Sequence, residues 1–341
     1  MMKPLVAVTR NGYIESLHWG LVCAVDADGK VVFAIGDSET KMFFRSSAKP
    51  IQAIPMIQAG AASAYDFTAE EIALACASHT GTPSHQKVTA SMLAKIGLVE
   101  ENLHCGIMRP YDAEEDRRLL TERLEPSLLH CSCSGKHAAM LALAKYRGHS
   151  VDNYHQSEHP VQQEIIQMVA RFANEDQANI TVATDGCGAP IYLLPARKIA
   201  MSYARLVQWA QNEHHQLHEA CRTVVQSMTA HPEMVSGEKE FCAALMRNTG
   251  GRIVAKVGAE AVYCLGIRDR QIGICVKIGD GNERAVYPAV LQVLRELGGI
   301  KDDEFSRLEE WYHIPVLNNL GQRVGEIRPA LGAVRLGLSV S

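Results

Sequence analysis

The sequence has little excess charge of either sign and no long apolar run. Lys and Arg number 34 against 38 Asp and Glu, which gives a formal net charge of -4. Because nucleic acids and anionic membranes are bound through broad basic surfaces, this balance argues against both kinds of partner. No stretch reaches the roughly 18 apolar residues of a membrane span. Small neutral or acidic substrates remain open.

The start of the chain also has little that suggests export. Its apolar run, residues 5–9, is shorter than the core of a signal peptide, so we expect a cytoplasmic protein. In that compartment the 10 cysteines are expected to be reduced thiols, buried or metal-binding, rather than a disulfide framework. Cys23, Cys264 and Cys275 lie inside apolar, strand-like runs and are expected in the core.

Apolar residues are plentiful, at 47% of the chain, and their spacing predicts strands at both ends. Strands are expected over 5–9, 20–25 and 31–35, with Asp28-Gly29 as the turn between the last two. Near the C-terminus, 251–267 and 271–280 each look like one strand, and a helix is expected over 285–297.

The middle of the chain has helical spacing throughout. Thr68 and Glu71 form a predicted capping box for a helix that leads up to Ser78. The other helices are expected over 48–60, 84–96, 134–146, 159–174 and, with interruptions, 195–229. The predicted fold class is therefore α+β. One domain, residues 1–341, would place a helical region of about 48–230 between terminal strands that share an antiparallel sheet.

A serine followed by a lysine at i+3 occurs four times, so the spacing alone is not specific. Two of these pairs, at Ser38 and Ser236, lie in charged segments typical of solvated turns, and Ser84 resembles a helix cap. Ser46 instead enters an almost uncharged helix, where Lys49 would lie on the same face one turn later.

In that apolar setting, desolvation would lower the pKa of Lys49, and a neutral lysine could take the proton of the Ser46 hydroxyl. The hydroxyl would then be a nucleophile, and the start of the helix would offer donors to an oxyanion. The alternative, that Ser46 caps the helix and Lys49 lies at the surface, stays open on local sequence.

Two K-x-G segments, Lys256-Val257-Gly258 and Lys277-Ile278-Gly279, lie in the late strands. Each either lines a cleft or marks the edge of a sheet. A helical S-x-x-K followed by K-[ST]-G on a strand is the arrangement of serine β-lactamases and penicillin-binding proteins. Val257 stands where that motif has a hydroxyl residue, so the strict match fails.

Thiols and imidazoles gather in "HCSCSGKH", residues 130–137, and "TDGCGAP", residues 184–190. Such a set suggests a soft divalent metal, with zinc as the first choice. From the residues alone the ligands would be Cys131, Cys133 and Cys187, with the flanking histidines as further candidates. Buried free thiols are the alternative interpretation.

Together these segments resemble the asparaginase II family of rhizobial-type L-asparaginases, in family order and over nearly the whole chain. The motifs that carry the resemblance are "VTRNGYIESLHWG", "RSSAKPIQAIP", "ALACASHTGTPSH", "CSGKHAAML", "HPVQQEI", "TDGCGAPIYLLP", "HPEMVSG", "KVGAEAVYCLGI" and "KIGDGNERA". The resemblance implies a fold like the serine β-lactamases, a homodimer, and hydrolysis of L-asparagine to L-aspartate and ammonia.

The resemblance also implies site residues by motif match. Its two Ser-Lys tandems would be Ser46 with Lys49 and Ser78 with Lys256. Its zinc ligands would be Cys133, Lys136 and Cys187, which replaces the set drawn from the residues alone. The implied substrate-binding residues are Arg45, His79 and His137, with Arg45 and His137 for the carboxylate, and Asp185 for the ammonium.

The resemblance suggests an acyl-enzyme mechanism in which neutral Lys49 deprotonates Ser46, while Ser78 with Lys256 moves the proton or activates water. Which serine attacks is left open, as is a glutaminase side activity. Zinc would order the pocket or the substrate rather than activate water. Segments His130–Ser132 and Glu238–Cys242 depart from the family pattern, and the second could alter substrate contacts.

Two other functions compete with this interpretation. One is hydrolysis of another small amide or of a β-lactam on the same fold, although the sequence has no S-D-N-like element and no strict K-T-G. The other is a zinc-binding or redox-sensing protein without turnover, in which the cysteines matter and the serines are helix caps.

Overall fold

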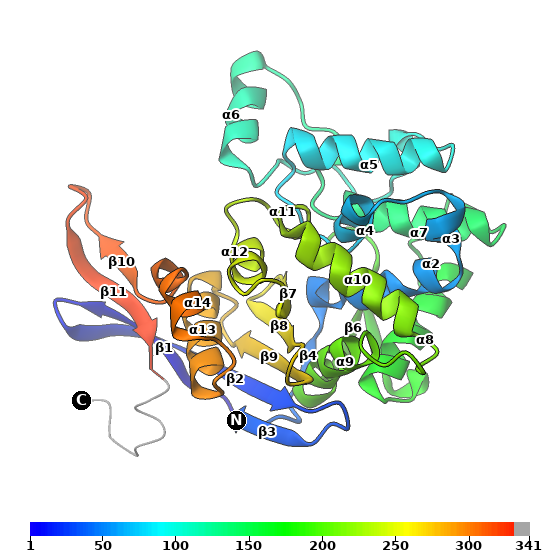
Figure 1. Cartoon of the computed structure of the whole chain (residues 1–341). Coiled ribbons are helices and arrows are strands. Elements are labelled where there is room, and N and C mark those ends of the chain that lie inside the picture. Colours follow the sequence, from blue (N-terminus) through cyan, green and yellow to red (C-terminus); the bar gives the residue numbers. More distant parts are fainter. Residues whose placement is uncertain (331–341) are drawn as a thin grey trace.

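The structure, a computed structural model, describes residues 1–330, in which two β-sheets are combined with a group of helices (Figure 1). The larger sheet has 8 strands, with the order β10-β11-β1-β2-β9-β8-β7 and β3 paired to β2; the smaller has the order β4-β6-β5. The strands are β1 (Lys3–Arg10), β2 (Tyr13–Val25), β3 (Val31–Ile35), β4 (Lys41–Phe43), β5 (Thr181–Thr184), β6 (Pro190–Pro195), β7 (Ile253–Gly258), β8 (Val262–Ile267), β9 (Ile272–Ile278), β10 (Ile314–Leu317) and β11 (Arg323–Pro329).

The helices are concentrated between β4 and β7, with two more after β9. A short 3₁₀ helix, Arg45–Ala48, leads into α1. The α-helices are α1 (Lys49–Gln52), α2 (Ile54–Gln58), α3 (Ala61–Ala64), α4 (Ala69–Ala75), α5 (Pro83–Lys95), α6 (Ala113–Glu122), α7 (Ser134–Tyr146), α8 (Pro160–Ala173), α9 (Ala196–Trp209), α10 (His218–Ala230), α11 (Pro232–Val235), α12 (Phe241–Asn248), α13 (Val286–Glu296) and α14 (Asp302–Ser306).

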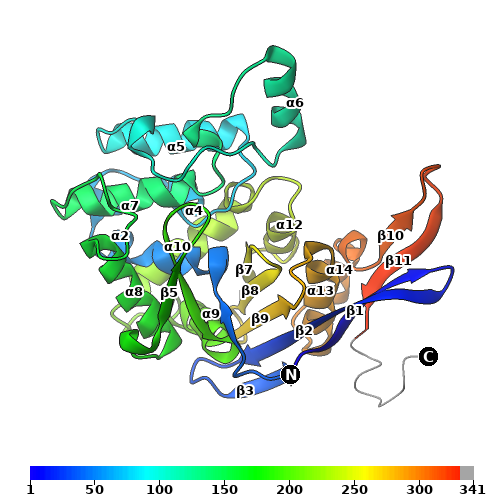
Figure 2. The ribbon, with the colours of Figure 1, turned by 180° about the vertical axis from the view of Figure 1, so that it is seen from behind.

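The two ends of the described chain share the larger sheet. β1 pairs antiparallel with both β2 and β11, and β2 pairs antiparallel with β9 in a register that places Cys23 opposite Cys275. Figure 2 shows the N-terminal strands beside the last strands and next to α13 and α14, with helices such as α2, α7 and α8 on the other side of the molecule. The predicted α+β class, with terminal strands in one antiparallel sheet and a helical middle, is confirmed.

Helices cover both faces of the sheet where β8 and β9 lie. A Cβ on Gly273 would lie 1.9 Å from the carbonyl oxygen of Ala200, so α9 packs directly against the backbone of β9. Ile267 on β8 and Leu294 on α13 meet beside Gly299, where an added Cβ would lie 2.7 Å and 3.1 Å from their side chains. Gly266, the neighbour of Ile267, contacts α9. Because side chains alternate between the faces of a strand, α9 and α13 lie on opposite faces. β8 is buried along its whole length as a result.

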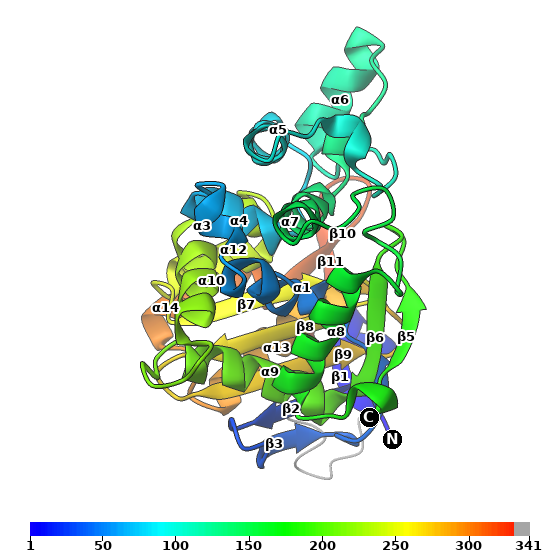
Figure 3. The ribbon, with the colours of Figure 1, turned by 90° about the vertical axis from the view of Figure 1, so that its right-hand side faces the viewer.

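The helical region is built around α4, which contacts α5, α7 and α10 (Figure 3). Thr68 and Glu71 form the predicted capping box at its N-terminus. The helix ends after Ala75, and the chain then continues without regular secondary structure through Ser78. β7, at one end of the larger sheet, contacts the 3₁₀ helix that precedes α1. This contact brings the sheet and the helical region together at the site described below.

Two predicted elements were wrong in detail. The segment 251–267 is a hairpin of β7 and β8, not one strand, because Glu260 and Ala261 both adopt positive φ angles of 62° and 57°. Such turns are usually marked by Gly or Asn, which the sequence lacks there. The predicted helix 48–60 is divided into α1 and α2, and each has a proline in its first turn.

Other elements were not predicted at all: the smaller sheet, helices α6, α12 and α14, and strands β10 and β11. Ser84 lies inside α5, whose cap is Thr82, so its predicted role as a cap was wrong. All ten cysteines are free and buried. Among residues 1–330, no helix combines the length and the apolar character needed to cross a membrane. The one-domain assignment to 1–341 stays a prediction, and its residues 331–341 lie outside the described residues.

Candidate active site

The hydroxyl of Ser78 lies between the amines of two buried lysines. Lys49 Nζ donates to Ser78 Oγ at 3.0 Å, and Lys256 Nζ donates to the same oxygen at 2.9 Å. Lys49 is the first residue of α1, and Lys256 lies on β7. Their exposed fractions are 1% and 0%. Three segments far apart in the sequence therefore meet at one serine.

This arrangement differs from the expected pairing of Ser46 with Lys49. The other hydrogen bonds of Lys49 Nζ go to the Ala77 carbonyl at 2.5 Å and to Cys133 Sγ at 3.1 Å. Within residues 1–330, no hydrogen bond joins Lys49 Nζ to Ser46 Oγ. The 3₁₀ turn at the start of the helix directs the lysine into the interior, toward Ser78. Ser46 still lines the same cavity as Ser78.

Burial lowers the pKa of Lys256 to about 7, and the nearby Lys49 contributes in the same direction. Taking two ammonium groups out of water beside each other is unfavourable, so one of them loses its proton readily. A lysine with this pKa is substantially neutral at pH 7 and can accept a proton. The site therefore supplies a lysine that can act as a base, and this lysine is Lys256.

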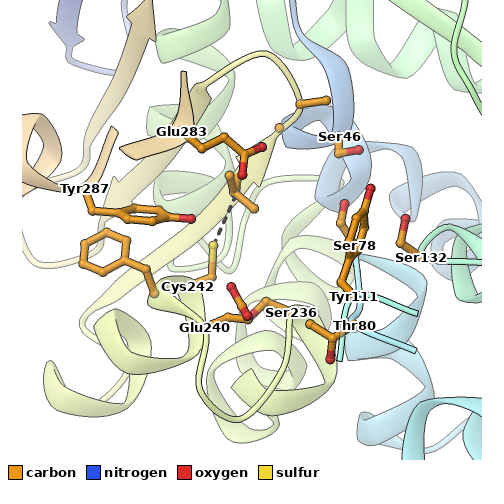
Figure 4. A pocket seen from close by; sticks show the side chains of 14 residues that line it. Ser46, Ser78, Thr80, Tyr111, Ser132, Ser236, Glu240, Cys242, Glu283 and Tyr287 are labelled. Atoms are coloured by element: carbon orange, nitrogen blue, oxygen red, sulfur yellow. Dashed lines mark hydrogen bonds between the residues drawn. The ribbon is translucent and has the colours of Figure 1, made fainter. Parts of the chain in front are cut away.

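The two serines open onto a cavity of about 350 Å³ (Figure 4). Ser46 and Ser78 lie on one side of it, and Tyr287 lies on the other. Polar and aromatic side chains make up most of the wall. The lining residues are Ser46, Ser78, Thr80, Tyr111, Ser132, Ser236, Glu240, Phe241, Cys242, Val257, Gly258, Ala259, Glu283 and Tyr287.

One wall of the cavity comes from Glu238–Cys242, the second of the two segments that depart from the family pattern. Glu240, Phe241 and Cys242 all line it, as does Ser236 just before them. The prediction that Ser236 lies in a solvated turn was wrong, because the residue is only 2% exposed. Its segment packs under Thr80, where a Cβ on Gly237 would come within 2.7 Å of the threonine hydroxyl.

Strand β7 runs closely along the 3₁₀ turn that holds Ser46. Ser47 Oγ donates to the Lys256 carbonyl at 3.0 Å. A Cβ on Gly258 would lie 3.0 Å from Ser47 Oγ and 3.3 Å from Arg45 Cβ, so glycine permits this approach. The K-x-G motif at Lys256 thus both lies at the edge of the sheet and lines the cavity. In the other K-x-G motif, Lys277 donates to the Glu260 carbonyl instead.

The residues expected to bind substrate, Arg45, His79, His137 and Asp185, do not line the cavity. Arg45 adopts a positive φ of 50°, and its Nη2 lies 2.9 Å from Asp185 Oδ1. Such a backbone conformation is unusual for a non-glycine residue and is frequent at functional sites. His79 Nε2 bonds Ser134 Oγ at 2.9 Å. His137 Nδ1 bonds the Tyr154 hydroxyl at 2.7 Å, while its buried Nε2 has no partner among the described residues.

A cluster of sulfur and nitrogen atoms lies next to Lys49. Lys136 Nζ is 3.0 Å from Cys187 Sγ, and Cys133 Sγ accepts a hydrogen bond from Lys49 Nζ. Hydrogen bonds from Cys131 and Cys187 hold the pKa of Cys133 well below its usual range. Burial would lower the pKa of Lys136, but Cys187 and Cys133 raise it overall.

Comparison with protein families identifies the chain. The family model described as L-asparaginase II matches residues 6–329. The chain belongs to the L-asparaginase II family. Comparison with curated proteins found no match.

Among solved structures, this L-asparaginase II family member is similar to a putative β-lactamase from Bacteroides dorei DSM 17855. The identity is 13%, the TM-score is 0.41, and the match covers 81% of this chain and 93% of that one. It is also similar to a β-lactamase from Mycobacterium bovis, with 11% identity, a TM-score of 0.45, and coverage of 82% and 95%. Neither similarity says anything of the reaction.

The zinc ligands implied by the family resemblance are chemically suited to a metal. Among residues 1–330 there is no group of three His, Cys, Asp or Glu that could hold one. The trio Cys133, Lys136 and Cys187 nevertheless offers two sulfur atoms and one amine, and Cys133 already favours its thiolate form. A metal would have to displace the proton of Lys136, so binding should weaken as pH falls. The two sulfur atoms suit zinc, and Lys136 would add a nitrogen ligand once it has lost its proton.

Of the other candidate ligands of this family member, His130 is held away from the trio, whereas Cys131 also hydrogen-bonds Cys133. His130 lies within 3.3 Å of Glu115, and Cys131 donates to the Cys105 carbonyl. The sequence did not single out two carboxylates that line the cavity, Glu240 and Glu283. Glu240 lies in the segment that departs from the family pattern, and Glu283 lies in the family motif "KIGDGNERA". Only the fold shows that both line the cavity of Ser78.

Proposed function

We propose that the protein is an L-asparaginase that hydrolyses L-asparagine to L-aspartate and ammonia through an acyl-enzyme on Ser78. Membership of the L-asparaginase II family supports an amidohydrolase. The observation that carries the mechanism is the position of Ser78 Oγ, which lies in a cavity and within 3.0 Å and 2.9 Å of two lysine nitrogens. Ser46, the nucleophile favoured by the sequence, has no hydrogen bond to a lysine nitrogen among residues 1–330.

In the acylation step, neutral Lys256 takes the proton of Ser78 as Oγ attacks the carbon of the side-chain amide. The proton then passes to the amide nitrogen, the C–N bond breaks, and ammonia leaves. An ester between Ser78 and the β-carboxyl group of aspartate remains. Lys49 donates to the same hydroxyl and to the Ala77 carbonyl, so it fixes the position of the attacking oxygen.

In the deacylation step, water attacks the ester carbon and gives its proton to Lys256. The lysine returns a proton to Ser78 Oγ as the ester bond breaks, which restores the free enzyme and releases aspartate. Ser46 lies in the same cavity and is placed to hydrogen-bond the substrate or this water. Zinc, when bound to Cys133, Lys136 and Cys187, would order this side of the pocket or orient the substrate.

The substrate assignment is tested by ammonia release from L-asparagine and L-glutamine, with β-lactam hydrolysis measured in parallel. We expect turnover of L-asparagine and at most weak turnover of the other two. Hydrolysis of the β-lactam alone would contradict this proposal and favour a β-lactam hydrolase on the same fold. Binding of zinc without any turnover would favour a zinc-binding or redox-sensing protein.

Zinc is proposed as the metal of the cluster, and its content can be measured independently of activity. Elemental analysis of the purified protein should find about one zinc per chain. The variant Cys187→Ser should lose the metal because it removes one of two sulfur ligands. A matched control, Cys221→Ser, changes a buried cysteine on α10 and should keep it. Retention of zinc by Cys187→Ser would contradict the assignment.

The homodimer and the cytoplasmic location belong to the same proposal and follow from the family resemblance and the sequence. Light scattering of the purified protein gives the oligomeric state directly. A mass of one chain at micromolar concentration would exclude the homodimer.

A further inference from the structure

Two carboxylates, Glu240 and Glu283, line the cavity that contains Ser78. Glu240 lies directly before α12, and Glu283 lies in the turn before α13. Figure 4 shows both carboxylates reaching into the cavity. Within residues 1–330 neither forms an ion pair, and no Arg, Lys or His lines this cavity. Among the described residues, neither carboxylate is therefore neutralised by an ion pair, and the lysines of the site bond Ser78 instead.

Ser236 adds an unsatisfied group to the same wall. Its side chain is 2% exposed, and Oγ has no hydrogen-bond partner among the described residues. A buried hydroxyl without a partner costs free energy, so such groups usually face a ligand or ordered water. Ser236 lines the cavity beside Glu240, and a bound molecule with N–H groups would satisfy it.

The electrostatics favour a bound cation over an anion. Burial raises the pKa of Glu240, and the neighbouring Glu283 and Asp112 raise it further. The pocket thus keeps negative charges close together at a cost that a positive ligand would relieve. Asp185, the residue expected to bind the ammonium of the substrate, is already paired with Arg45 and lies outside the cavity lining.

We propose that Glu240, Glu283 and Ser236 form a subsite that binds the ammonium group of an amide substrate. An ammonium group has three N–H donors, and this wall offers it three acceptor groups. The inference rests on the proposed function and makes it more specific. The enzyme would select primary amides that carry a positive charge at the end remote from Ser78, and of the three residues only Glu240 comes from the segment that departs from the family pattern.

The test compares L-asparagine with succinamate, which is L-asparagine without its ammonium group. Steady-state kcat and KM are measured for the parent, Glu240→Gln and Glu283→Gln. For each variant, KM for L-asparagine should rise about 10-fold or more, as expected for loss of a hydrogen bond to a charged group. KM for succinamate should stay the same or fall. The matched control Glu238→Gln changes an exposed residue paired with Arg247 and should behave as the parent.

Equal changes for both substrates in the glutamine variants, or a parent that does not distinguish the two substrates, would overturn the subsite. A binding measurement separates this failure from failure of the proposed function. Calorimetry on Ser78→Ala, and on the same protein with Glu240→Gln added, needs no turnover. Preferential binding of L-asparagine that is lost with Glu240→Gln supports the subsite even if the parent releases no ammonia. Equal binding of both compounds contradicts it.

Discussion

The variant Ser78→Ala is expected to lower kcat for L-asparagine by about 10⁴-fold or more, the size seen when a nucleophile is removed from a catalytic unit. The hydroxyl of Ser78 is the one oxygen that both lysines contact, so no other described group can replace it. Ammonia release under substrate saturation measures the effect. Zinc content and the thermal unfolding temperature should match those of the parent.

The variant Ser46→Ala is the matched control, because it removes a hydroxyl from the same cavity without removing a partner of either lysine. It should lower kcat far less than Ser78→Ala does. The reverse order, with Ser46→Ala inactive and Ser78→Ala active, would return the nucleophile to the position that the sequence favoured.

The variant Lys256→Met should lower kcat by about 10²- to 10⁴-fold, the usual contribution of a general base. Methionine fills a similar volume but cannot accept the proton of Ser78. The free energy of unfolding should increase or stay the same, because the variant no longer has to bury a lysine on β7. A loss of less than about tenfold would show that another group acts as the base.

If Lys256 is the general base, the activity should depend on pH in a defined direction. Below a pKa of about 7, Lys256 is protonated and cannot take the serine proton; above it the amine is neutral. Activity of the parent, as kcat/KM, should therefore rise with pH through a midpoint near 7. In Lys256→Met the residual activity should lose this rise. A parent profile that falls through the same range would contradict the assignment of Lys256 as a base.

The sequence predicts local elements well where one segment carries its own signals. The capping box at Thr68 and the helix at 134–146 are present as predicted, because caps and apolar spacing act within one element. The hairpin at Glu260-Ala261 was missed since two non-glycine residues adopt positive φ there. Short edge strands such as β10 have too little pattern to be recognised.

The site is only partly readable from the sequence. The contact between Ser78 and Lys256 joins residues 178 positions apart, and only the family resemblance pointed to it. Which serine Lys49 reaches depends on the direction that a 3₁₀ turn gives to one side chain, and spacing carries no such information. Glu240 and Glu283 lie in different segments, and their common cavity depends on the packing of α12 and α13 against the sheet.

The most direct test of the account identifies the serine that carries the acyl group. The reaction with L-asparagine is quenched in acid within its first turnover, the protein is digested, and the peptides are mapped by mass spectrometry. The account predicts an aspartyl ester on the peptide that contains Ser78, and none on the peptide that contains Ser46. An ester on Ser46, with Ser78 unmodified, would contradict it.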